Sequence, residues 1–154
     1  MVKKSSKIAK NSKAFFDYEI LERFEAGIVL SGTEVRSLRD NNCQLVDTFI
    51  MVRNGELWLN NLHITPYAHG GFDNQEPLRR RKLLMHKKQI RYLGSATAEK
   101  GMSIIPLSIY FDNSSRVKLE IGLAKGKKNY DKRADIAKRD SDREIRRALK
   151  ERSR

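Results

Sequence analysis

Residues 121–133 read I-G-L-A-K-G-K-K-N-Y-D-K-R and divide the chain into two parts of different character. Before them the sequence alternates apolar and polar residues as strands do, and after them it is almost entirely charged, with a sparse helical pattern. Within the stretch, Gly122 and Gly126 are expected to free the backbone, and lysines stand close to the ring of Tyr130. Lysines beside an aromatic ring suit a nucleic acid, because cations meet phosphates and a flat ring stacks on a base. The plain alternative is a solvated linker after a last strand.

The charge along the 154 residues separates a nearly neutral body from two basic ends. Residues 1–13 hold five lysines and no acid, and residues 125–154 hold 13 basic and 6 acidic residues, a net of +7. The whole chain carries +13, which leaves the body, residues 14–124, near +1. Polyanions are therefore the expected partners, nucleic acid before an anionic membrane surface. We expect three parts: a basic N-terminal arm that is disordered in isolation, an RNA-binding body and a basic tail.

Short alternating segments separated by turn residues favour a mainly β body, a small barrel rather than a parallel sheet. The alternation predicts strands over residues 15–30, 48–53, 56–64, 104–111 and 116–123. Asn54-Gly55 is the strongest hairpin signal, and Gly27 indicates a bulge or a close backbone approach. A break followed by a helix start is expected at residues 31–34, a second helix over residues 87–99, and a loop over residues 66–77.

Residues 134–152 form the longest segment without strand character. Small and apolar residues recur there at helical spacing, and oppositely charged residues four apart can pair. The large apolar residues, Ile136, Ile145 and Leu149, are too few to hold a helix on a core, and isolated helices are marginal in water. We therefore expect a tail that is disordered when free and helical when bound.

The residue types that carry catalysis or bind metals show no recognisable set. Cys43 is the only cysteine, so no disulfide forms within the chain, which fits a reducing compartment. His63, His69 and His86 lack metal-ligand spacing, and no phosphate-binding glycine loop is present. No apolar run is long enough to span a membrane, and the N-terminus lacks the apolar centre of a signal peptide. We expect a cytoplasmic protein that is not an enzyme, with no cofactor and no metal.

Several body residues are candidates for RNA contact, each with an ordinary alternative. Arg79 to Lys82 can clamp phosphates or form a solvated loop. The aromatic residues Phe15, Phe16, Tyr18 and Trp58 can stack on bases, although aromatics at strand spacing are more often core. Glu25 can accept a hydrogen bond from a base edge or a 2′-hydroxyl, or be an exposed strand residue.

The order of five segments resembles the SmpB family, the SsrA-binding proteins of bacteria. They are N-S-K-A-F-F-D-Y (11–18), F-E-A-G-I-V-L-S-G-T-E-V-R-S-L-R (24–39), L-H-I-T-P (62–66), R-K-L-L (81–84) and G-L-A-K-G-K-K-N-Y-D-K-R (122–133). The resemblance covers nearly the whole chain in order. It implies an oligonucleotide-binding-fold (OB-fold) antiparallel β-barrel with short flanking helices and a basic C-terminal tail that becomes helical when bound.

The same resemblance implies a function in ribosome rescue. It implies binding to transfer-messenger RNA (SsrA), which needs the protein for stable association with stalled ribosomes, so that trans-translation rescues them and tags the nascent chain for degradation. The body would mimic an anticodon stem, and the tail would enter the decoding centre and the empty mRNA channel of the small subunit. Elongation factor Tu is an indirect partner, and we expect a monomer.

Site residues follow from motif positions of that family. Those facing the tRNA-like part of the RNA are Asn11, Glu25, Leu84 and Lys118. Those meeting the decoding centre are Gly126, Lys127, Lys128, Tyr130, Asp131, Lys132 and Arg133. Further along the tail, the residues expected in the mRNA channel are Lys138, Arg139, Arg143, Ile145, Arg146 and Arg147.

This chain departs from the family at two of its tail positions. Many relatives carry His at the position of Tyr130, and only His can hold a positive charge near neutral pH, so a proton-linked role is not expected here. Many relatives also place Trp near Ser141, which leaves Ile145 and Leu149 as candidate anchors.

Two other functions compete with an adaptor for ribosome rescue. One is a general ribosomal or single-strand RNA-binding module with the same barrel. The other is a metal-dependent nuclease that uses body carboxylates. The motif G-K-K-x-x-D-K-R at residues 126–133 favours the adaptor over the first, and the absence of a clustered acidic motif weighs against the second.

Overall fold

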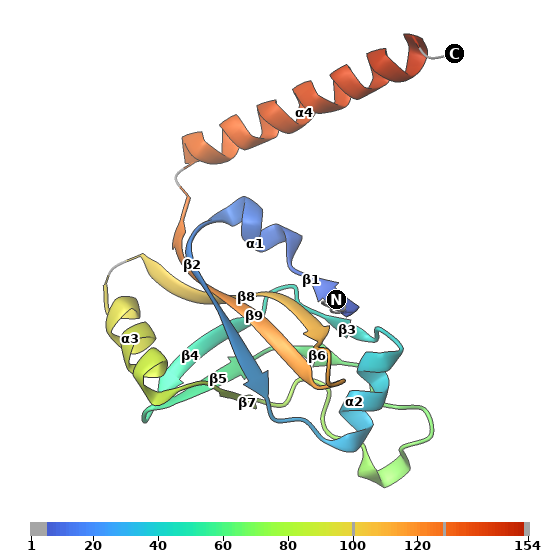
Figure 1. Ribbon diagram of the computed structural model, residues 1–154, viewed down its shortest axis with the longest axis vertical. Coiled ribbons are helices and arrows are strands. Elements are labelled where there is room, and N and C mark those ends of the chain that lie inside the picture. The colour runs from blue at the N-terminus through green and yellow to red at the C-terminus, as the bar shows by residue number, and fades with distance from the viewer. Residues whose placement is uncertain (1–5, 100, 128, 153–154) are drawn as a thin grey trace.

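A computed structural model describes residues 6–99, 101–127 and 129–152, and Figure 1 shows a closed sheet from which one long helix stands away. The strands are β1 (Ser6–Lys10), β2 (Tyr18–Ile28), β3 (Cys43–Gln44), β4 (Phe49–Arg53), β5 (Glu56–Asn60), β6 (His63–Ile64), β7 (Arg81–Leu84), β8 (Met102–Phe111) and β9 (Val117–Gly126). The helices are α1 (Ser12–Asp17), α2 (Gly32–Arg39), α3 (Lys87–Thr97) and α4 (Asn129–Arg152), with a 3-10 turn at Gly71–Asp73.

Seven antiparallel strands form one ring-like sheet in the order β1-β8-β4-β5-β7-β2-β9, and β8 also pairs with β9 to close it. Buried residues alternate with more exposed ones along β5 and the first half of β9, whereas β8 is buried over six consecutive residues, so the interior fills with aliphatic side chains. The fully buried ones include Leu57, Leu59, Leu83, Ile109, Leu119 and Ile121. The prediction of a mainly β, antiparallel body with short helices is confirmed.

Local signals placed one hairpin turn and one helix correctly. Asn54 and Gly55 both have positive φ, 53° and 74°, which is the backbone of the two-residue hairpin between β4 and β5. Ser31 caps α2, since its side chain accepts from the Glu34 backbone amide and the Glu34 carboxylate accepts from the Ser31 amide. The helix ends at Asp40, the first of three polar residues that run to Asn42.

The first predicted strand begins later than the alternation suggests. Residues 12–17 form α1, because the Asn11 side chain accepts from the Ala14 amide at 3.2 Å and caps a helix there. Phe15 and Phe16 therefore belong to a helix and not to a strand. The register shift in β2 lies between Ile20 and Glu22 and not at Gly27, which pairs regularly with both neighbouring strands.

The prediction of a disordered arm is wrong for the part of it that the structure describes. Residues 6–10 form β1 and pair with β8, and Ile8 and Ala9 pack against the core. Two apolar side chains on a strand edge were enough to order a segment that its lysines made look solvated. Residues 1–5 lie outside the described part of the chain.

The glycines of the dividing stretch do not act through unusual backbone angles. Neither Gly122 nor Gly126 has a positive φ. A Cβ on Gly122 would lie 3.1 Å from Leu107 Cδ1 and 3.2 Å from Ile20 Cγ2, so this glycine permits close packing. At Gly126 a side chain would meet open space, and the local geometry does not require glycine.

Helix α4 follows β9 and extends away from the barrel (Figure 1). Its large apolar residues, Ile136, Ile145 and Leu149, are all exposed, as their small number predicts. Residues 129–152 form the helix that the spacing of small and apolar residues predicts, and the expectation that the tail is disordered when free stays a prediction. Contacts at its first turns, described below, supply an anchor that the sequence does not reveal.

Candidate nucleic-acid interface

One outer face of the closed sheet brings together three of the four body residues expected to meet RNA. Glu25 on β2 pairs with Glu120 on β9, and two residues on, Gly27 pairs with Lys118. Directly paired residues point to the same side of a sheet, and Ala26 between them is buried, so Glu25, Gly27 and Lys118 face outward. Glu25 and Lys118 are more than 90 residues apart in the sequence, and the pairing of β2 with β9 brings them together.

Strand β7 adds Leu84 to the same face, because Gly27 also pairs with Leu84. The Leu84 side chain is 53% exposed, which is unusual for leucine in a strand. A cavity of about 370 Å³ opens here, and its lining includes Gly27, Leu84, Arg116 and Lys118. A Cβ on Gly27 would lie 3.4 Å from Leu84 Cβ, so the glycine leaves room for the groove. We call this feature the β2–β7–β9 groove.

Tyr110 on β8 joins this face and was missed by sequence analysis. It pairs with Lys118, and its hydroxyl donates a hydrogen bond to the carboxylate of Glu25. Burial and the nearby Glu25 carboxylate raise the pKa of Tyr110, so the phenol stays protonated and donates. The hairpin register of residues 104–123 was the signal that could have found it, since it sets Tyr110 opposite Lys118.

An ion pair lies on the same face. The Arg23 guanidinium donates to the Glu120 carboxylate at 3.1 Å, so Glu120 is already neutralised and Lys118 is the cation left to meet a ligand. The arrangement therefore combines one cation, one oriented carboxylate and one exposed aliphatic side chain. Such a set selects by hydrogen bonding and shape more than by total charge.

Asn11 does not reach this face. Its side chain is buried, with only 7% of the residue exposed, and both ends of its amide are used within the protein. The oxygen caps α1, and the nitrogen donates to the Pro106 carbonyl at 3.0 Å. The structure thus gives Asn11 the role of joining α1 to β8.

The basic run at residues 79–82 is not the phosphate clamp that its composition suggested. Arg81 is fully buried and donates to Glu34 at 2.7 Å, and Arg79 donates to the same carboxylate. Lys82 donates to Glu56 at 3.0 Å. Only Arg80 of the four remains exposed without a carboxylate partner among the described residues. The alternation of β7 turns every second residue inward, which a run of four cations concealed.

The first part of the tail, residues 127–139, contacts α1 at several points. The backbone amide of Lys127 donates to the Asp17 carbonyl at 2.9 Å, and its ammonium donates to the Phe15 carbonyl at 3.1 Å and pairs with Asp135. Lys132 pairs with Asp17 at 3.5 Å. The Arg139 guanidinium lies 5.3 Å from the ring centre of Phe16. The hydrogen bond from Lys127 lowers the pKa of Asp135.

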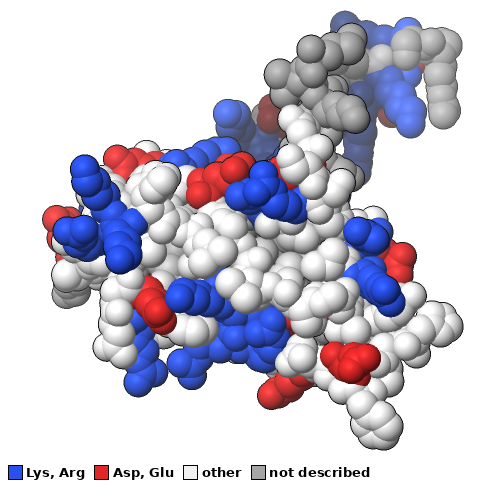
Figure 2. Space-filling model, turned by 60° about the horizontal axis from the view of Figure 1, so that its bottom comes forward, with Lys and Arg blue, Asp and Glu red and all other residues white. Residues whose placement is uncertain are grey.

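These contacts engage some of the tail residues predicted to meet the ribosome, namely Lys127, Lys132 and Arg139. Arg133 is exposed, as are the side chains farther along α4: Lys138, Arg143, Ile145, Arg146 and Arg147. Gly126 ends β9 opposite Tyr18. Lys128 lies outside the described residues, and so do the side chains of Tyr130 and Asp131. On the face of the body that Figure 2 shows, basic side chains are interspersed with acidic ones.

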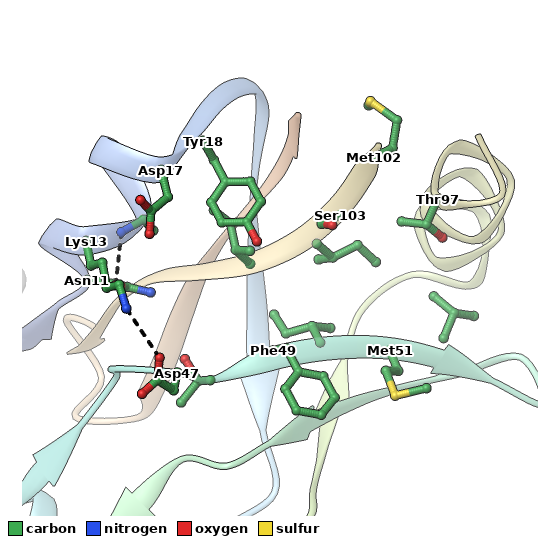
Figure 3. Close-up of a pocket in the computed structure, with 16 residues that line it drawn as sticks. Asn11, Lys13, Asp17, Tyr18, Asp47, Phe49, Met51, Thr97, Met102 and Ser103 are labelled. Carbon is green, nitrogen blue, oxygen red and sulfur yellow. Dashed lines mark hydrogen bonds and ion pairs between the residues drawn. The ribbon is translucent and has the colours of Figure 1, made fainter. Parts of the chain in front are cut away.

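A cavity of about 630 Å³ lies between α1, β4, β8 and the end of α3 (Figure 3). It marks the place where β4 and β8 pair only through Ile50 and Ile104. Its polar rim holds Asp17 and Asp47, with Lys13 lying 3.6 Å from Asp47. Two acids against one paired lysine do not favour phosphate, so this cavity is not part of the candidate interface.

Metal and membrane sites were also sought among the residues that the structure describes. No three His, Cys, Asp or Glu side chains come together there in a way that could hold a metal ion. None of the described helices is both long and apolar enough to cross a membrane.

Comparisons with known proteins agree with one another. A family model described as SmpB protein matches residues 8–151. The SsrA-binding protein of Geobacter sulfurreducens is 57% identical over 146 residues, which cover 95% of each chain. The SsrA-binding protein of Carboxydothermus hydrogenoformans is 55% identical over 94% of this chain and 97% of its own. A chain of a solved structure described as "tmRNA-SmpB: a journey to the center of the bacterial ribosome" superposes with a TM-score of 0.67 at 46% identity, covering 79% of this chain and 85% of that one.

Proposed function

Since the chain belongs to the SmpB family, we propose that it is an RNA-binding adaptor that binds transfer-messenger RNA and acts with it in trans-translation on the ribosome. The curated relatives are named for binding SsrA, and the solved relative is described with transfer-messenger RNA and the ribosome. The observation in this chain that carries the proposal is the β2–β7–β9 groove, where Glu25, Leu84 and Lys118 meet.

In this proposal the groove meets the tRNA-like part of the RNA. Lys118 binds a phosphate, and Glu25 accepts a hydrogen bond from a 2′-hydroxyl or a base edge through the carboxylate that Tyr110 orients. Leu84 packs on an exposed ribose or base. A body near +1 cannot select this RNA by charge, so selectivity lies in the shape and the hydrogen bonds of the groove.

The tail serves the ribosome. The proposal places Gly126, Lys127, Lys128, Tyr130, Asp131, Lys132 and Arg133 at the decoding centre. It places α4 in the mRNA channel, with its cations, Lys138, Arg139, Arg143, Arg146 and Arg147, toward rRNA phosphate and Ile145 as an apolar anchor. This tail function is supported by the net charge of +7 and by the exposure of α4.

The test is binding of the full chain to the isolated tRNA-like domain and to an unrelated duplex of equal length. Lys118→Gln and Glu25→Gln should each weaken binding to the tRNA-like domain by roughly tenfold or more, because each removes a charged hydrogen bond. The unrelated duplex should lose little. Arg39→Gln, which removes an exposed charge from α2, is the matched control and should leave both affinities nearly unchanged.

An equal loss on both RNAs would contradict selectivity at the groove. It would favour the alternative of a general single-strand or ribosomal RNA-binding module with the same barrel. No described residue cluster supports the nuclease alternative.

A further inference from the structure

The outward face of the β4–β5 hairpin carries side chains that neither the core nor the β2–β7–β9 groove uses. Ile50, Leu57 and Leu59 point inward and are buried, so their neighbours in sequence point outward. Met51 pairs directly with Trp58, which places the thioether beside the indole on that outward face. Met51 is 50% exposed and Phe49 is 42% exposed. Phe49 and Met51 also contribute to the lining of the large cavity, and Figure 3 draws their side chains on the side of the β4 ribbon away from β8.

Two arginines border this apolar strip. Arg53 and Arg80 line a shallow recess of about 90 Å³ together with Met51, Trp58 and Asn60. Among the residues that the structure describes, neither arginine has a carboxylate partner. Glu56, the acid on the same hairpin, is held by Lys82 at 3.0 Å. The recess therefore has a flat aromatic wall, an amide and two available cations.

The position of β4 and β5 in the chain matches that of the strands that bind oligonucleotides in barrels of the OB type. Apart from β1, which belongs to the N-terminal arm, the strands of five or more residues are, in chain order, β2, β4, β5, β8 and β9, and α3 lies between the third and the fourth of these. In barrels of the OB type, the second and third strands form the face that binds oligonucleotides. Here the second and third strands are β4 and β5, and it is their outward face that presents Trp58 between Arg53 and Arg80.

The chemistry of the recess matches one ligand class. An unpaired base stacks on an indole or thioether, and each flanking phosphate meets a guanidinium. The Asn60 amide can hydrogen-bond to a base edge. A double-stranded segment cannot offer its base faces to Trp58, so the ligand is single-stranded. A protein partner would need apolar side chains to cover Met51 and Phe49 and acids to meet both arginines.

We propose that the outward face of β4 and β5 is a second RNA-binding surface, which holds an unpaired nucleotide by stacking on Trp58 and by phosphate contacts to Arg53 and Arg80. The inference rests on the proposed function only in taking RNA as the polyanion. The surface is separate from the β2–β7–β9 groove, which shares no lining residue with the recess.

Trp58 is the only tryptophan in the chain, so its fluorescence reports on this face alone. A ten-nucleotide single-stranded uridine oligonucleotide, titrated into the full chain at low salt, should quench that fluorescence. The quench should follow the same curve as binding measured by anisotropy of a labelled oligonucleotide. An abasic oligonucleotide of equal length and charge should bind through its phosphates without the quench. Saturated binding with no quench would overturn the proposal.

Variants test the same face without relying on fluorescence. Trp58→Ala should weaken oligonucleotide binding by about tenfold or more, whereas Trp58→Phe should retain most of it, because stacking needs a ring. Replacing both Arg53 and Arg80 with Gln should reduce the slope of log affinity against log salt concentration by about 1.4 in magnitude, roughly 0.7 for each lost phosphate contact. Arg36→Gln with Arg39→Gln removes the same charge from α2 and is the matched control.

The double arginine variant keeps the proposal testable even if Trp58→Ala fails to fold. If it matched the α2 control in affinity and salt dependence, the recess would not be an RNA site, and the apolar strip would have to be assigned to a protein partner. This outcome would leave the proposed function untouched, because that function is tested separately by the binding of Lys118→Gln and Glu25→Gln to the tRNA-like domain.

Discussion

Arg81 and Glu34 form an ion pair inside the protein, with Arg81 Nε donating to Glu34 Oε2 at 2.7 Å. The Arg81 guanidinium also donates to the Leu62 carbonyl at 2.6 Å and to the Pro77 carbonyl at 3.1 Å. Glu34 at the same time belongs to the cap of α2. One buried pair therefore links α2, β7 and both ends of the segment 62–77, which holds β6 and the loop after it, and so positions β7, which carries Leu84.

Glu34→Gln should destabilise the fold by about 3–5 kcal/mol, because it leaves a buried guanidinium without its counter-charge. Glu56→Gln is the matched control. Its pair with Lys82 is largely exposed, and its loss should cost at most about 1 kcal/mol. Urea unfolding at neutral pH measures both. A loss at Glu34→Gln no larger than at Glu56→Gln would show that the buried pair is not structural.

Acid should remove the same stabilisation. Burial alone would raise the pKa of Glu34, but hydrogen bonds from Arg79, from the Ser31 amide and from Arg81 outweigh it and hold that pKa below its ordinary 4.5. The contribution is therefore complete above pH 4.5 and is lost as the pH falls through the folded-state value. Unfolding free energies between pH 7 and pH 3 should fall less steeply in Glu34→Gln than in the parent chain. Parallel curves would contradict the assignment.

Cys43 should be a slow nucleophile in the folded protein. Burial raises the pKa of its thiol from 9.0 to about 11, although Arg81 nearby opposes the shift. At pH 8 its thiolate fraction should be about a hundredfold lower than that of an ordinary thiol. Alkylation by iodoacetamide, followed by mass spectrometry, should be slow in buffer and fast in urea. Equal rates would mean that the thiol is not shielded.

Body and tail should separate at Lys127. A chain ending there keeps all of β9 and its pairing to Gly126, so it should retain the fold of the barrel. It should bind the tRNA-like domain with nearly the affinity of the full chain, yet fail to support ribosome rescue in a purified translation system. A large loss of affinity at moderate salt would assign the tail to the first RNA interface instead.

Amide exchange along α4 should be graded. Residues 132–139 are linked to α1 through Lys132 and Arg139 and to Lys127 through Asp135, while residues 140–152 are all exposed. Protection in the free protein should therefore fall from the first half of the helix to the second. Asp135→Asn should lower it in the first half, and Asp140→Asn should not. Uniform strong protection would mean that the whole helix is packed.

The second half of α4 should matter only on the ribosome. Ile145→Pro breaks a helix interior at a cost of about 3 kcal/mol, so it should abolish rescue and leave binding to free transfer-messenger RNA intact. Ile145→Ala is the control for the loss of the side chain alone. Normal rescue by Ile145→Pro would show that a helix is not needed there.

Local patterns predicted the hairpin at Asn54-Gly55, the start of α2, helix α3 and the long strands of the β8–β9 hairpin, because each depends on neighbours in sequence. Local patterns gave wrong predictions where contacts between residues distant in sequence determine the structure. Arg81 looked solvated until Glu34, far along the chain, was placed beside it. Asn11 turned Phe15 and Phe16 into a helix, and β8 ordered the arm as β1. Of the site, the resemblance supplied Glu25, Leu84 and Lys118, whereas Tyr110 needed the register.

Helix α4 begins three residues after β9 ends, and this short connection has a consequence for reach. Twenty-four residues at 1.5 Å each make a rod of about 36 Å, whereas a flexible chain of that length would average about 27 Å between its ends, with wide spread. With its root held at α1, the rod delivers its far end to one fixed radius from the barrel. Insertions or deletions within α4 would shift that radius and turn its charged face by 100° per residue, so the helix acts as a ruler whose length and phase are set together.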